Sequence, residues 1–384
     1  MKTSDLMILE DKKSHRNFRK RSRIVGTFLC LLFTCSCAVD DSQTIPPESD
    51  NPAHRAYFNL RGNAQGTTYQ IKYKDAMGRN LQSKLDSLLA DFDWHVSTYM
   101  DTSILSDFNN SNVEYYCQIV SPILAECFSR SKEVYENTDH AFNPAVYPLV
   151  DFWGFYDLNE VHRRPSQDQL DSILDIVTLD SAGVSLRVKM LDDGTEVCQL
   201  CKTDSRLKLD FNAIAQGYAV DLLALFLKNK GIDNYMVELG GEVKCNGINP
   251  DGNTWKIGID SPIEQVETPE RKLHATVVLS NQAMATSGNY RKFYEADGKK
   301  YSHTIDPRTG RPVEHSLLSA TVVCEDAILA DAYATAFMVF GVEKTKTFLK
   351  DYPELGVYLI YSDDQGGYRS WVSRSMEEIL VELK

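Results

Sequence analysis

Hydrophobic and polar residues alternate between Gly66 and Lys74, a period of two that is typical of a strand with one buried face. A helical period follows, and its apolar positions are Leu81, Leu85, Leu88, Leu89 and Phe92. Side chains three and four residues apart share one face of a helix, so these positions predict an amphipathic helix. The folded part of the chain is therefore expected to open with a strand and then a helix.

Three further helices are expected, at residues 121–138, 213–230 and from about 326 to 340. The first begins at a Ser-Pro pair, which supplies an N-cap and a first-turn proline. The other two carry apolar residues at helical spacing and run into Gly231 and Gly341. Glycine is the usual residue just past a helix end, so both helices are predicted to stop there.

Two hairpins are expected, at residues 183–201 and 289–305, because each contains an Asp-Gly pair, at 193–194 and 297–298. The segment 141–155, AFNPAVYPLVDFWGF, has no clean period and is interpreted as an ordered loop or a recognition surface. Strands and helices mix without regular alternation. The fold class is therefore predicted to be α+β.

The N-terminal region reads as a targeting segment. A basic stretch precedes an apolar run at residues 24–33 that is too short to span a bilayer. The following TCSC resembles a bacterial lipoprotein cleavage box, with Cys37 as the lipidated residue. We expect residues 1–37 to be a lipoprotein signal, 38–54 a disordered polar tether and 55–384 the folded domain. An uncleaved anchor or a plain secretory signal is the alternative, and each places the body outside the cytoplasm, on the periplasmic side of a bacterial membrane.

Charge and cysteine content narrow the function. The formal net charge of −13 argues against nucleic acid, because binding a phosphate backbone requires a cationic surface. An anionic ligand would need a cation. Six cysteines follow the tether, and some could pair in an oxidising compartment. The C-x-x-C at Cys198 and Cys201 has no second cysteine pair, so a local disulfide or free thiols are expected there rather than zinc.

Asp331 and Thr335 are four residues apart on the predicted helix that ends at Gly341. This spacing places a carboxylate and a hydroxyl on one helix face. Oxygen ligands of this kind suit magnesium, although a solvated face or a local hydrogen bond would give the same pattern. Alanines at positions 330, 332, 334 and 336 leave the backbone open to close approach.

A second group of residues outlines a pocket. Asp210 is expected at a strand end, just before a helix whose free amides would attract an anion. Gln216 and Gly217 lie in the first turns of that helix. Gly240 and Gly241 end the next predicted strand, where glycine permits close approach of a ligand. Taken singly, each residue has a structural explanation as a cap or a turn.

The stretch YSHTIDPRTGRPV, at residues 301–313, ends a predicted strand with a turn. Asp306, Pro307 and Gly310 are typical turn residues. Turn formation does not explain His303 or Arg308. A histidine beside an arginine and an aspartate could position phosphate or move a proton.

These pieces together resemble the ApbE-type FAD:protein FMN transferases. The resemblance is carried by seven blocks that occur in order and cover most of residues 60–341: GNAQGTTY (62–69), STYMDTSILSDFN (97–109), AFNPAVYPLVDFWGF (141–155), LDFNAIAQGYAVD (209–221), VELGGEVKCNG (237–247), ATSGNYRKFYEADGKKYSHTIDPRTGRPV (285–313) and ADAYATA (330–336).

The resemblance implies a single two-lobed α+β domain with mixed or antiparallel sheets flanked by helices, which binds FAD between its lobes and Mg²⁺ at the pyrophosphate. It also implies transfer of FMN to a threonine or serine hydroxyl of an acceptor flavoprotein, through a phosphoester, with release of AMP. The acceptor is expected in trans, because the family's acceptor motif, S/T-G-A-S/T, is absent from this sequence.

The resemblance also assigns residues by their place in the motifs. The FAD site would be lined by Gln65, Tyr99, Ala141, Phe142, Asn143, Asp210, Gln216 and Ile305. Magnesium would be held by the Ala213 carbonyl and the side-chain oxygens of Asp331 and Thr335. Our own hypothesis is that His303 or Asp306 is the catalytic base that deprotonates the acceptor hydroxyl, with Arg308 fixing the turn.

Three positions depart from the family pattern. Methionine is common where Gln65 stands, lysine where Gln216 stands and aspartate where Asn143 stands. A flavin contact and a cation near the phosphates are therefore changed, whereas the expected metal ligands are intact. Two alternatives remain open: a Mg²⁺-dependent FAD pyrophosphatase that yields FMN and AMP, and a flavin-binding lipoprotein without turnover.

Overall fold

The computed structural model describes residues 57–155, 165–180, 183–262, 273–289, 293–296, 299–302, 304–363, 365 and 367–382. All of these belong to one compact unit, Thr44–Lys384. The expected signal at residues 1–37 and tether at 38–54 lie outside the described residues, and so does His303. None of the helices within the described ranges combines the length and apolar character needed to cross a lipid bilayer.

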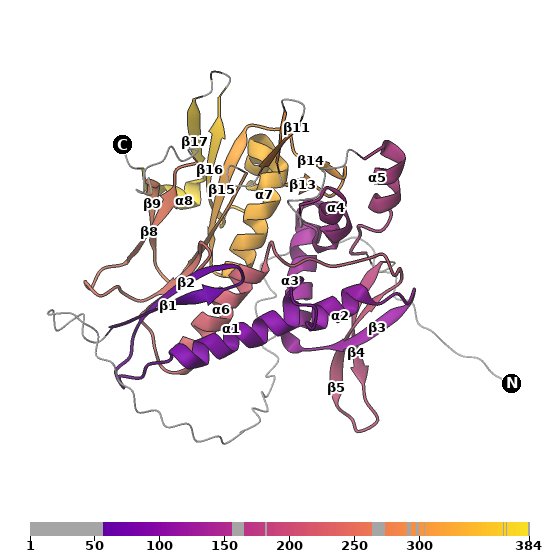
Figure 1. Ribbon diagram of the computed structural model, residues 1–384. Coiled ribbons are helices and arrows are strands. Elements are labelled where there is room, and N and C mark those ends of the chain that lie inside the picture. The colour runs from indigo at the N-terminus through magenta and orange to yellow at the C-terminus, as the bar shows by residue number, and fades with distance from the viewer. Residues whose placement is uncertain are drawn as a thin grey trace. The chain divides into compact units, whose positions relative to one another are not determined.

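An eight-stranded sheet organises the backbone, and each neighbouring pair in it is antiparallel (Figure 1). Its strands, in spatial order, are β1 (Tyr57–Ala64), β2 (Thr67–Lys74), β6 (Tyr235–Leu239), β7 (Glu242–Asn246), β10 (Ala283–Gly288), β15 (Leu317–Cys324), β16 (Gly356–Ser362) and β17 (Tyr368–Val372). The described chain therefore opens with a hairpin, β1–β2, rather than the single strand that the pattern predicted.

Both faces of the central strands are buried, as β16 illustrates. Val357 and Leu359 join the largest hydrophobic cluster, whereas Tyr358 and Ile360 join a second cluster on the opposite face. The largest cluster takes side chains from α1 (Gln82–Val96), α3 (Pro122–Asn137), α6 (Ala215–Asn229) and α7 (Ala327–Phe348), among other elements. The second cluster is shared with the three-stranded sheet of β8 (Trp255–Asp260), β9 (Leu273–Leu279) and β18 (Leu380–Glu382), and with α8 (Arg374–Glu377).

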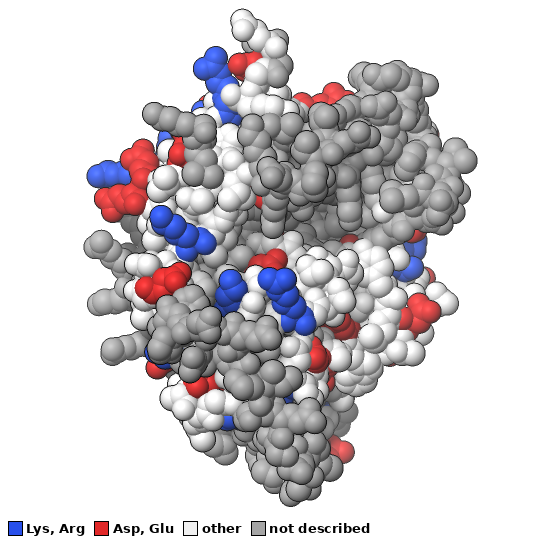
Figure 2. Space-filling view, turned by 60° about the vertical axis from the view of Figure 1, so that its left-hand side comes forward, with Lys and Arg blue, Asp and Glu red and all other residues white. Residues whose placement is uncertain are grey.

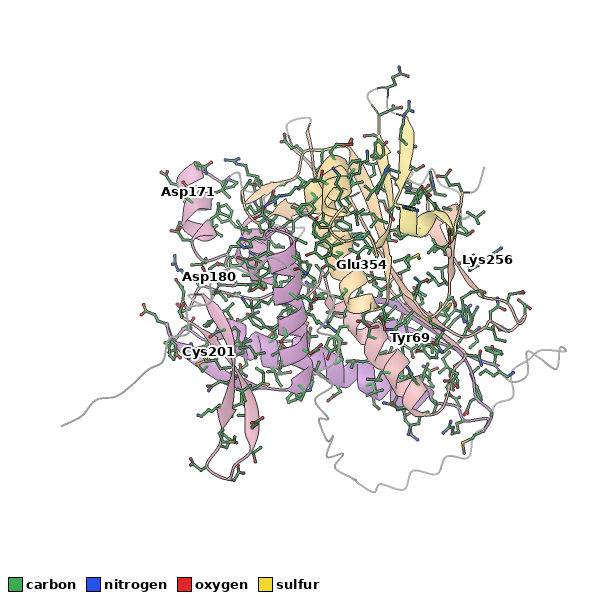
Figure 3. All side chains as sticks on the ribbon, turned by 180° about the vertical axis from the view of Figure 1, so that it is seen from behind. Tyr69, Asp171, Asp180, Cys201, Lys256 and Glu354 are labelled. Carbon is green, nitrogen blue, oxygen red and sulfur yellow. A yellow bond between two sulfur atoms is a disulfide. The ribbon has the colours of Figure 1, made fainter. Side chains whose placement is uncertain are left out.

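A smaller lobe contains α2 (Ile104–Asn110) and a sheet in the order β3 (Tyr116–Val120), β5 (Glu196–Lys202), β4 (Val184–Met190). Cys117 and Cys201 are register partners on β3 and β5, and they form a disulfide (Figure 3). Cys198 is a free thiol. Residues three apart on a strand point to opposite faces, so Cys201 pairs across strands and a local bridge to Cys198 is not formed.

Several expectations about elements need correction. Segment 141–155 is partly helical, with a 3₁₀ turn η2 (Pro144–Val146) followed by α4 (Tyr147–Phe152). The Asp193-Gly194 turn is longer than two residues, because Met190 pairs with Glu196. A short helix, α5 (Gln167–Leu174), was not predicted.

Gly341 lies inside α7 instead of ending it. The first helical segment does break there, since Gly341 has φ 71° and ψ −178°, a combination that side chains exclude. The chain then resumes a helix to Phe348. The ring of His315 fills the space above Gly341, and its Nε2 lies 2.8 Å from the Met338 carbonyl at the break.

Two small hairpins complete the described elements. The register of β11 (Phe293–Ala296) and β12 (Lys299–Ser302) pairs Ala296 with Lys299, which confirms the predicted strands; the turn residues lie outside the described ranges. The second hairpin joins β13 (Ile305–Asp306) to β14 (Arg311–Pro312). The predicted α+β class is confirmed.

Candidate active site at the crossing of α6 and α7

The first turns of α6 and α7 cross closely at Gly217. A Cβ at this position would lie 2.2 Å from the Ala327 carbonyl oxygen and 2.8 Å from the Asp331 Cβ, so the crossing requires glycine. This contact brings the motif that contains Gln216 against the helix that carries Asp331 and Thr335. Two groups of predicted site residues, more than a hundred positions apart in sequence, therefore meet.

Asp331 is buried at this crossing, and its Oδ2 accepts a hydrogen bond from the Gly217 N–H at 3.1 Å. Burial raises the pKa of Asp331 to about 7, and this single backbone donor only partly opposes the rise. Within the described ranges no cationic side chain forms an ion pair with Asp331. One helical turn further on, the half-buried Thr335 has its Oγ1 3.2 Å from the Ser287 Oγ on β10.

The start of α6 leaves an unused acceptor. Ile214, the N-cap, has φ −152° and ψ −20°, which opens the first turn. The Gly217 N–H donates to Asp331, and among the described residues we find no backbone N–H that donates to the Ala213 carbonyl. A carbonyl, a carboxylate and a hydroxyl are all hard oxygen donors, so the residues present fit Mg²⁺. The described residues contain no cluster of three or more His, Cys, Asp or Glu side chains suited to a metal.

Each of the two helices also places a carboxylate at the start of the other helix. The carboxylate on α6 was not predicted from the sequence. Asp221 on α6 caps α7, since its Oδ2 accepts from the Ile328 N–H at 2.9 Å. Its Oδ1 is 2.6 Å from the Lys244 Nζ on β7. Burial raises the pKa of Asp221, and Lys244 opposes that rise. Asp326 also lies near Lys244, at 3.4 Å.

Gln216 is the second residue of α6, next to Gly217, and Gln65 lies in the turn between β1 and β2. Gln65 occupies the β1–β2 turn with φ 51°, and its Nε2 donates to the Asp93 Oδ1 at 3.0 Å. The Gln216 amide lies against Gly240, where a Cβ would be 2.9 Å from its Nε2. Gly240 and Gly241, both with positive φ, form the β6–β7 turn. The predicted pocket residues Gln216, Gly217 and Gly240 are therefore neighbours.

Asp210 and Tyr99 share one partner, Asn212. The Asn212 N–H donates to the Asp210 Oδ1 at 2.7 Å, and the Asn212 Nδ2 donates to the Tyr99 hydroxyl at 3.3 Å. Tyr99 is 73% exposed, so most of its side chain faces solvent. Asp210 is buried in an irregular segment; the strand end predicted for it is not formed.

The 141–143 segment is fixed beside Asp210, whose N–H donates to the Pro144 carbonyl at 2.7 Å. Ala141 and Phe142 are buried. The Asn143 side chain holds the backbone on both sides, because its Oδ1 accepts from the Ala145 N–H at 2.9 Å and its Nδ2 donates to the Val177 carbonyl at 3.1 Å. Asn143 therefore supports the wall of the site through backbone contacts.

Sequence reasoning missed the clamp that positions Asp210. Buried Asn109 exchanges two 2.8 Å hydrogen bonds with the backbone N–H and carbonyl of Leu209. The buried Lys202 Nζ donates to the carbonyls of Asn109, Ser205 and Leu207, at 3.2–3.3 Å. Burial lowers the pKa of Lys202 to about 8. The only signal in the sequence is a lysine directly after the hairpin predicted at residues 183–201, and the burial that gives this lysine its role depends on the fold.

The turn after β13 is internally braced. Both Asp306 oxygens accept from Arg308, from its Nε at 2.8 Å and its Nη2 at 2.6 Å. The Trp153 indole N–H donates to the Gly310 carbonyl at 2.8 Å, and Gly310 has φ 68°. Ile305 is buried with Leu149 and Trp153 in a third cluster. The turn is thus fixed against the 141–155 segment.

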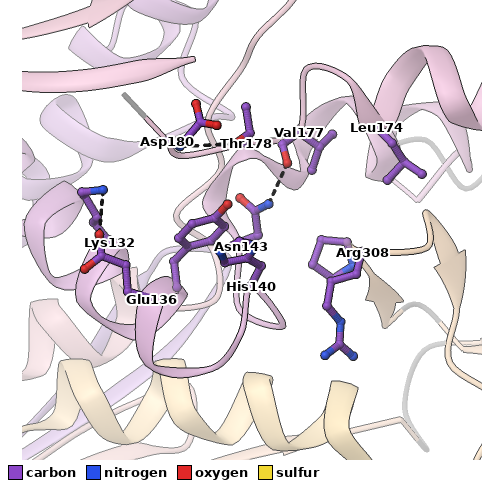
Figure 4. A pocket seen from close by; sticks show the side chains of 11 residues that line it. Lys132, Glu136, His140, Asn143, Leu174, Val177, Thr178, Asp180 and Arg308 are labelled. Carbon is purple, nitrogen blue, oxygen red and sulfur yellow. Dashed lines mark hydrogen bonds and ion pairs between the residues drawn. The ribbon is translucent and has the colours of Figure 1, made fainter. Parts of the chain in front are cut away.

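A cavity of about 460 Å³ lies behind this wall (Figure 4). Asn143 and Arg308 line it, together with Lys132 and His140 from the end of α3 and the turn after it. Figure 2 shows one face of the molecule, on which basic side chains are interspersed with acidic ones. An anionic ligand would therefore meet local cations rather than a broad positive field.

Comparison with curated proteins gives one consistent set of relatives. A FAD:protein FMN transferase of Haemophilus influenzae is 34% identical over 318 residues, which are 80% of this chain and 88% of the relative. Another of the same name from Escherichia coli is 33% identical over 328 residues, 85% of this chain and 90% of the relative.

The solved structures that resemble this chain carry the same kind of name as the curated relatives. The flavin transferase ApbE from Vibrio cholerae is 32% identical with a TM-score of 0.71, and the match covers 84% of this chain and 99% of that one. The apo form of the Pseudomonas stutzeri flavinyl transferase ApbE is 30% identical with a TM-score of 0.72, covering 84% and 96%. Residues 65–359 match the ApbE family as a whole. The chain belongs to the ApbE family.

Proposed function

We propose that this protein transfers FMN from FAD to a threonine or serine hydroxyl of an acceptor protein and releases AMP. The relatives, named for FMN transfer from FAD to a protein, support the general activity. The observation that carries the proposal is the buried Asp331 carboxylate. It has no cationic partner among the described residues, and it faces the start of α6. The Ala213 carbonyl, which accepts no backbone hydrogen bond from the described residues, directly precedes that helix.

The reaction exchanges the phosphoanhydride bond of FAD for a phosphoester bond to the acceptor. The acceptor hydroxyl oxygen forms a bond to the FMN phosphorus of FAD, and the bond from that phosphorus to the bridging oxygen breaks. AMP leaves with the electron pair of the broken bond. The hydroxyl proton passes to a base on the enzyme and then to solvent, so charge and atoms balance.

Mg²⁺ would be held by the Ala213 carbonyl, Asp331 and Thr335. When bound, it neutralises charge on the pyrophosphate and makes AMP a better leaving group. The chain's own residues prepare the site. Gly217 brings the helices together, Ser287 orients the Thr335 hydroxyl, and the Gly217 N–H orients the Asp331 carboxylate.

For FAD, the proposed contacts divide into two groups. Gln216 lies beside the helix crossing, near the place proposed for the phosphates, and Gln65 in the β1–β2 turn is assigned to the same group. The exposed Tyr99 ring, Asp210, the 141–143 wall and Ile305 form the other group, held together by Asn212 and the Asn109 clamp. The lysine that family members commonly have at the place of Gln216 would add charge to the first group.

For the proton transfer we propose His303. The double hydrogen bond from Arg308 occupies both oxygens of Asp306, which supports a structural role for Asp306 in the turn. This leaves the histidine two residues before β13 as the proposed base.

The test is an intact-mass measurement of an acceptor protein co-expressed with this chain. A covalent FMN adduct is expected with the wild type, and neither Asp331→Ala nor His303→Ala should give one at saturating FAD. Incubation with FAD, Mg²⁺ and an acceptor-motif peptide separates the alternatives. Free FMN without labelled peptide would favour the pyrophosphatase, and FAD left intact would favour a flavin-binding lipoprotein.

We also propose that the protein acts outside the cytoplasm, tethered by lipid on Cys37. The Cys117–Cys201 disulfide supports this placement, because disulfides persist in oxidising compartments. Cys37→Ser should release the protein from the membrane fraction. Retention of that variant in membranes would contradict the lipid anchor.

A further inference from the structure

A cationic hollow of about 450 Å³ lies between the end of α7 and the segment that joins β17 to α8. None of the described residues that we assign to the metal, the base or FAD lines it. Trp371 of β17 lines the hollow and lies in one register row with Leu359, Ala320 and Ser287. Three strand spacings therefore separate Trp371 from Ser287, the partner of Thr335, a distance of about 14 Å. The hollow is a second site, distinct from the proposed active site.

The charge of this hollow differs from that of the whole chain. Lys346, Lys350 and Arg374 line it, and Glu378 is its one acidic lining residue within the described ranges. Three positive charges and one negative charge leave a surplus of two positive charges. Because the formal net charge of the chain is −13, the hollow is a local exception in an acidic protein. Like charges that line one hollow attract an ion of the opposite charge from solution.

In the described part of the chain, two of these three cations have no carboxylate partner. Five other arginines of the described ranges each form an ion pair: Arg79, Arg130, Arg206, Arg308 and Arg369. Neither Arg374 nor Lys350 forms an ion pair or a side-chain hydrogen bond with any residue in those ranges. The third cation, Lys346, has a Glu343 oxygen 2.7 Å from its Nζ. The guanidinium of Arg374 and the ammonium of Lys350 are therefore available to a ligand.

The walls of the hollow are fixed by contacts of their own. The hydroxyls of Ser373 and Ser375 both donate to the Leu355 carbonyl, at 3.2 and 2.7 Å, which ties the start of α8 to the start of β16. Lys346 lies over the Trp371 ring, with its Nζ 5.8 Å from the ring centroid. A site whose walls are already held in place loses little conformational entropy when a ligand binds.

We propose that the hollow binds a phosphate monoester group, held by Arg374 and Lys350. Such a group carries about two negative charges at neutral pH, which matches the surplus of two positive charges, whereas one carboxylate would match half of it. A planar guanidinium can bind two phosphate oxygens at once, and an ammonium adds a point charge beside them. The group can belong to a soluble compound or to the headgroup of a membrane lipid such as phosphatidic acid. This site is independent of the proposed function.

The first test measures the binding of inorganic phosphate to the purified full-length protein by isothermal titration calorimetry, without FAD and Mg²⁺. The wild type should bind a single phosphate. The double change Lys350→Gln and Arg374→Gln should weaken this binding about tenfold or more, because it removes both unpaired cations. Both positions are exposed, so the variant should fold and keep the wild-type midpoint of urea unfolding.

The matched control is the double change Arg187→Gln and Lys189→Gln. These residues are also an arginine and a lysine at exposed positions, on β4, so the control removes the same charge from another surface. It should keep phosphate affinity within about twofold of the wild type. An equal loss in the two double variants would show that only the net charge of the protein attracts phosphate, and would overturn the site.

A second test separates a lipid headgroup from a soluble phosphate. It uses Cys37→Ser, which lacks the proposed lipid anchor, with vesicles of phosphatidylcholine and phosphatidic acid at about four to one, or of phosphatidylcholine alone. Co-sedimentation that is about fivefold stronger with phosphatidic acid, and that Lys350→Gln with Arg374→Gln removes, would assign the hollow to a headgroup. Equal co-sedimentation with both kinds of vesicle, together with phosphate binding in solution, would assign it to a soluble compound.

The site is overturned if neither inorganic phosphate nor phosphatidic acid binds. It is also overturned if the variant that lacks Lys350 and Arg374 binds them as tightly as the protein that retains both residues.

Discussion

Two carboxylates at the α6–α7 crossing do similar work under different electrostatic conditions. Asp221 on α6 caps the start of α7, and Asp331 on α7 accepts from the first turn of α6. Asp331 is buried and Asp221 is half-buried, and loss of solvation raises the pKa of each. Asp221 has the Lys244 ammonium 2.6 Å away, whereas Asp331 has no cationic side chain in an ion pair within the described ranges.

The presence or absence of a paired cation separates Asp221, a structural carboxylate, from Asp331, a candidate metal ligand. A buried charge is tolerated when an opposite charge and hydrogen bonds compensate it. For Asp221 the protein supplies that charge itself. For Asp331 it supplies a backbone N–H, a nearby hydroxyl and an open carbonyl, which leaves a place for a cation from solution.

The largest expected effect is on activity. Asp331→Asn keeps an oxygen for the Gly217 N–H but removes the negative charge, so kcat/KM for FMN transfer should fall about a thousandfold. Asp221→Asn should stay within about tenfold of the wild type, because that charge is already neutralised by Lys244. Steady-state flavinylation of a peptide acceptor measures both. Equal losses in the two variants would contradict the contrast.

The next effect is on stability. Lys244→Met leaves Asp221, whose side chain is only 14% exposed, without its partner and should lower the free energy of unfolding by about 3 kcal/mol in urea titrations. Adding Asp221→Asn to that variant should restore most of the loss. Lys346→Met breaks an exposed pair with Glu343 and should cost below about 1 kcal/mol. A Lys244 effect as small as the Lys346 effect would show that Asp221 does not depend on its ammonium.

A third effect is on pH dependence. The pKa of Asp331, about 7, is above its unfolded value, so its contribution to stability is complete below about pH 4 and is lost as pH rises through 7. Without metal, the wild type should therefore lose about 2 kcal/mol between pH 5 and 8 relative to Asp331→Asn. Added Mg²⁺ should restore stability at pH 8 in the wild type only. Parallel pH curves for the two proteins would argue against a buried, uncompensated carboxylate.

The smallest effect concerns Gln216, which stands where family members commonly have a lysine. Gln216 adjoins Gly217 and lies against Gly240, and Gln216→Lys would place an ammonium beside the proposed phosphate position. KM for FAD should fall several-fold, about 1 kcal/mol, with little change in kcat. Gln65→Met, the other family-like exchange, adds no charge and serves as the control. An unchanged KM for Gln216→Lys would place the phosphates elsewhere.

Local pattern predicted the elements that depend on neighbouring residues. Ser121 caps α3 through the Leu124 N–H, and Gly231 follows α6 with φ 77°, as the sequence indicated. The pattern failed where distant partners decide. β1 forms because β2 is available to pair with it, and the 141–155 segment becomes partly helical with Asn143 capping η2.

The same division applies to the site. The i, i+4 spacing of Asp331 and Thr335 was readable because helix geometry alone places them on one face. Asn109 and Lys202 were not readable, since their partners lie in the segment 205–209 and, for Lys202, at Asn109 on α2. Asp221 was missed for the same reason: its cation is on β7 and the N–H that it caps is on α7.

The sequence by itself determined the helices with their caps, the turn-forming residues and the oxygen donors available for a cation. These follow from short-range sterics and from side-chain chemistry, which each residue carries wherever it lies. Only the tertiary structure decided which carboxylate keeps a counter-charge. That depends on Gly217 letting two helices approach, and on a lysine that one strand places beside Asp221 and not beside Asp331.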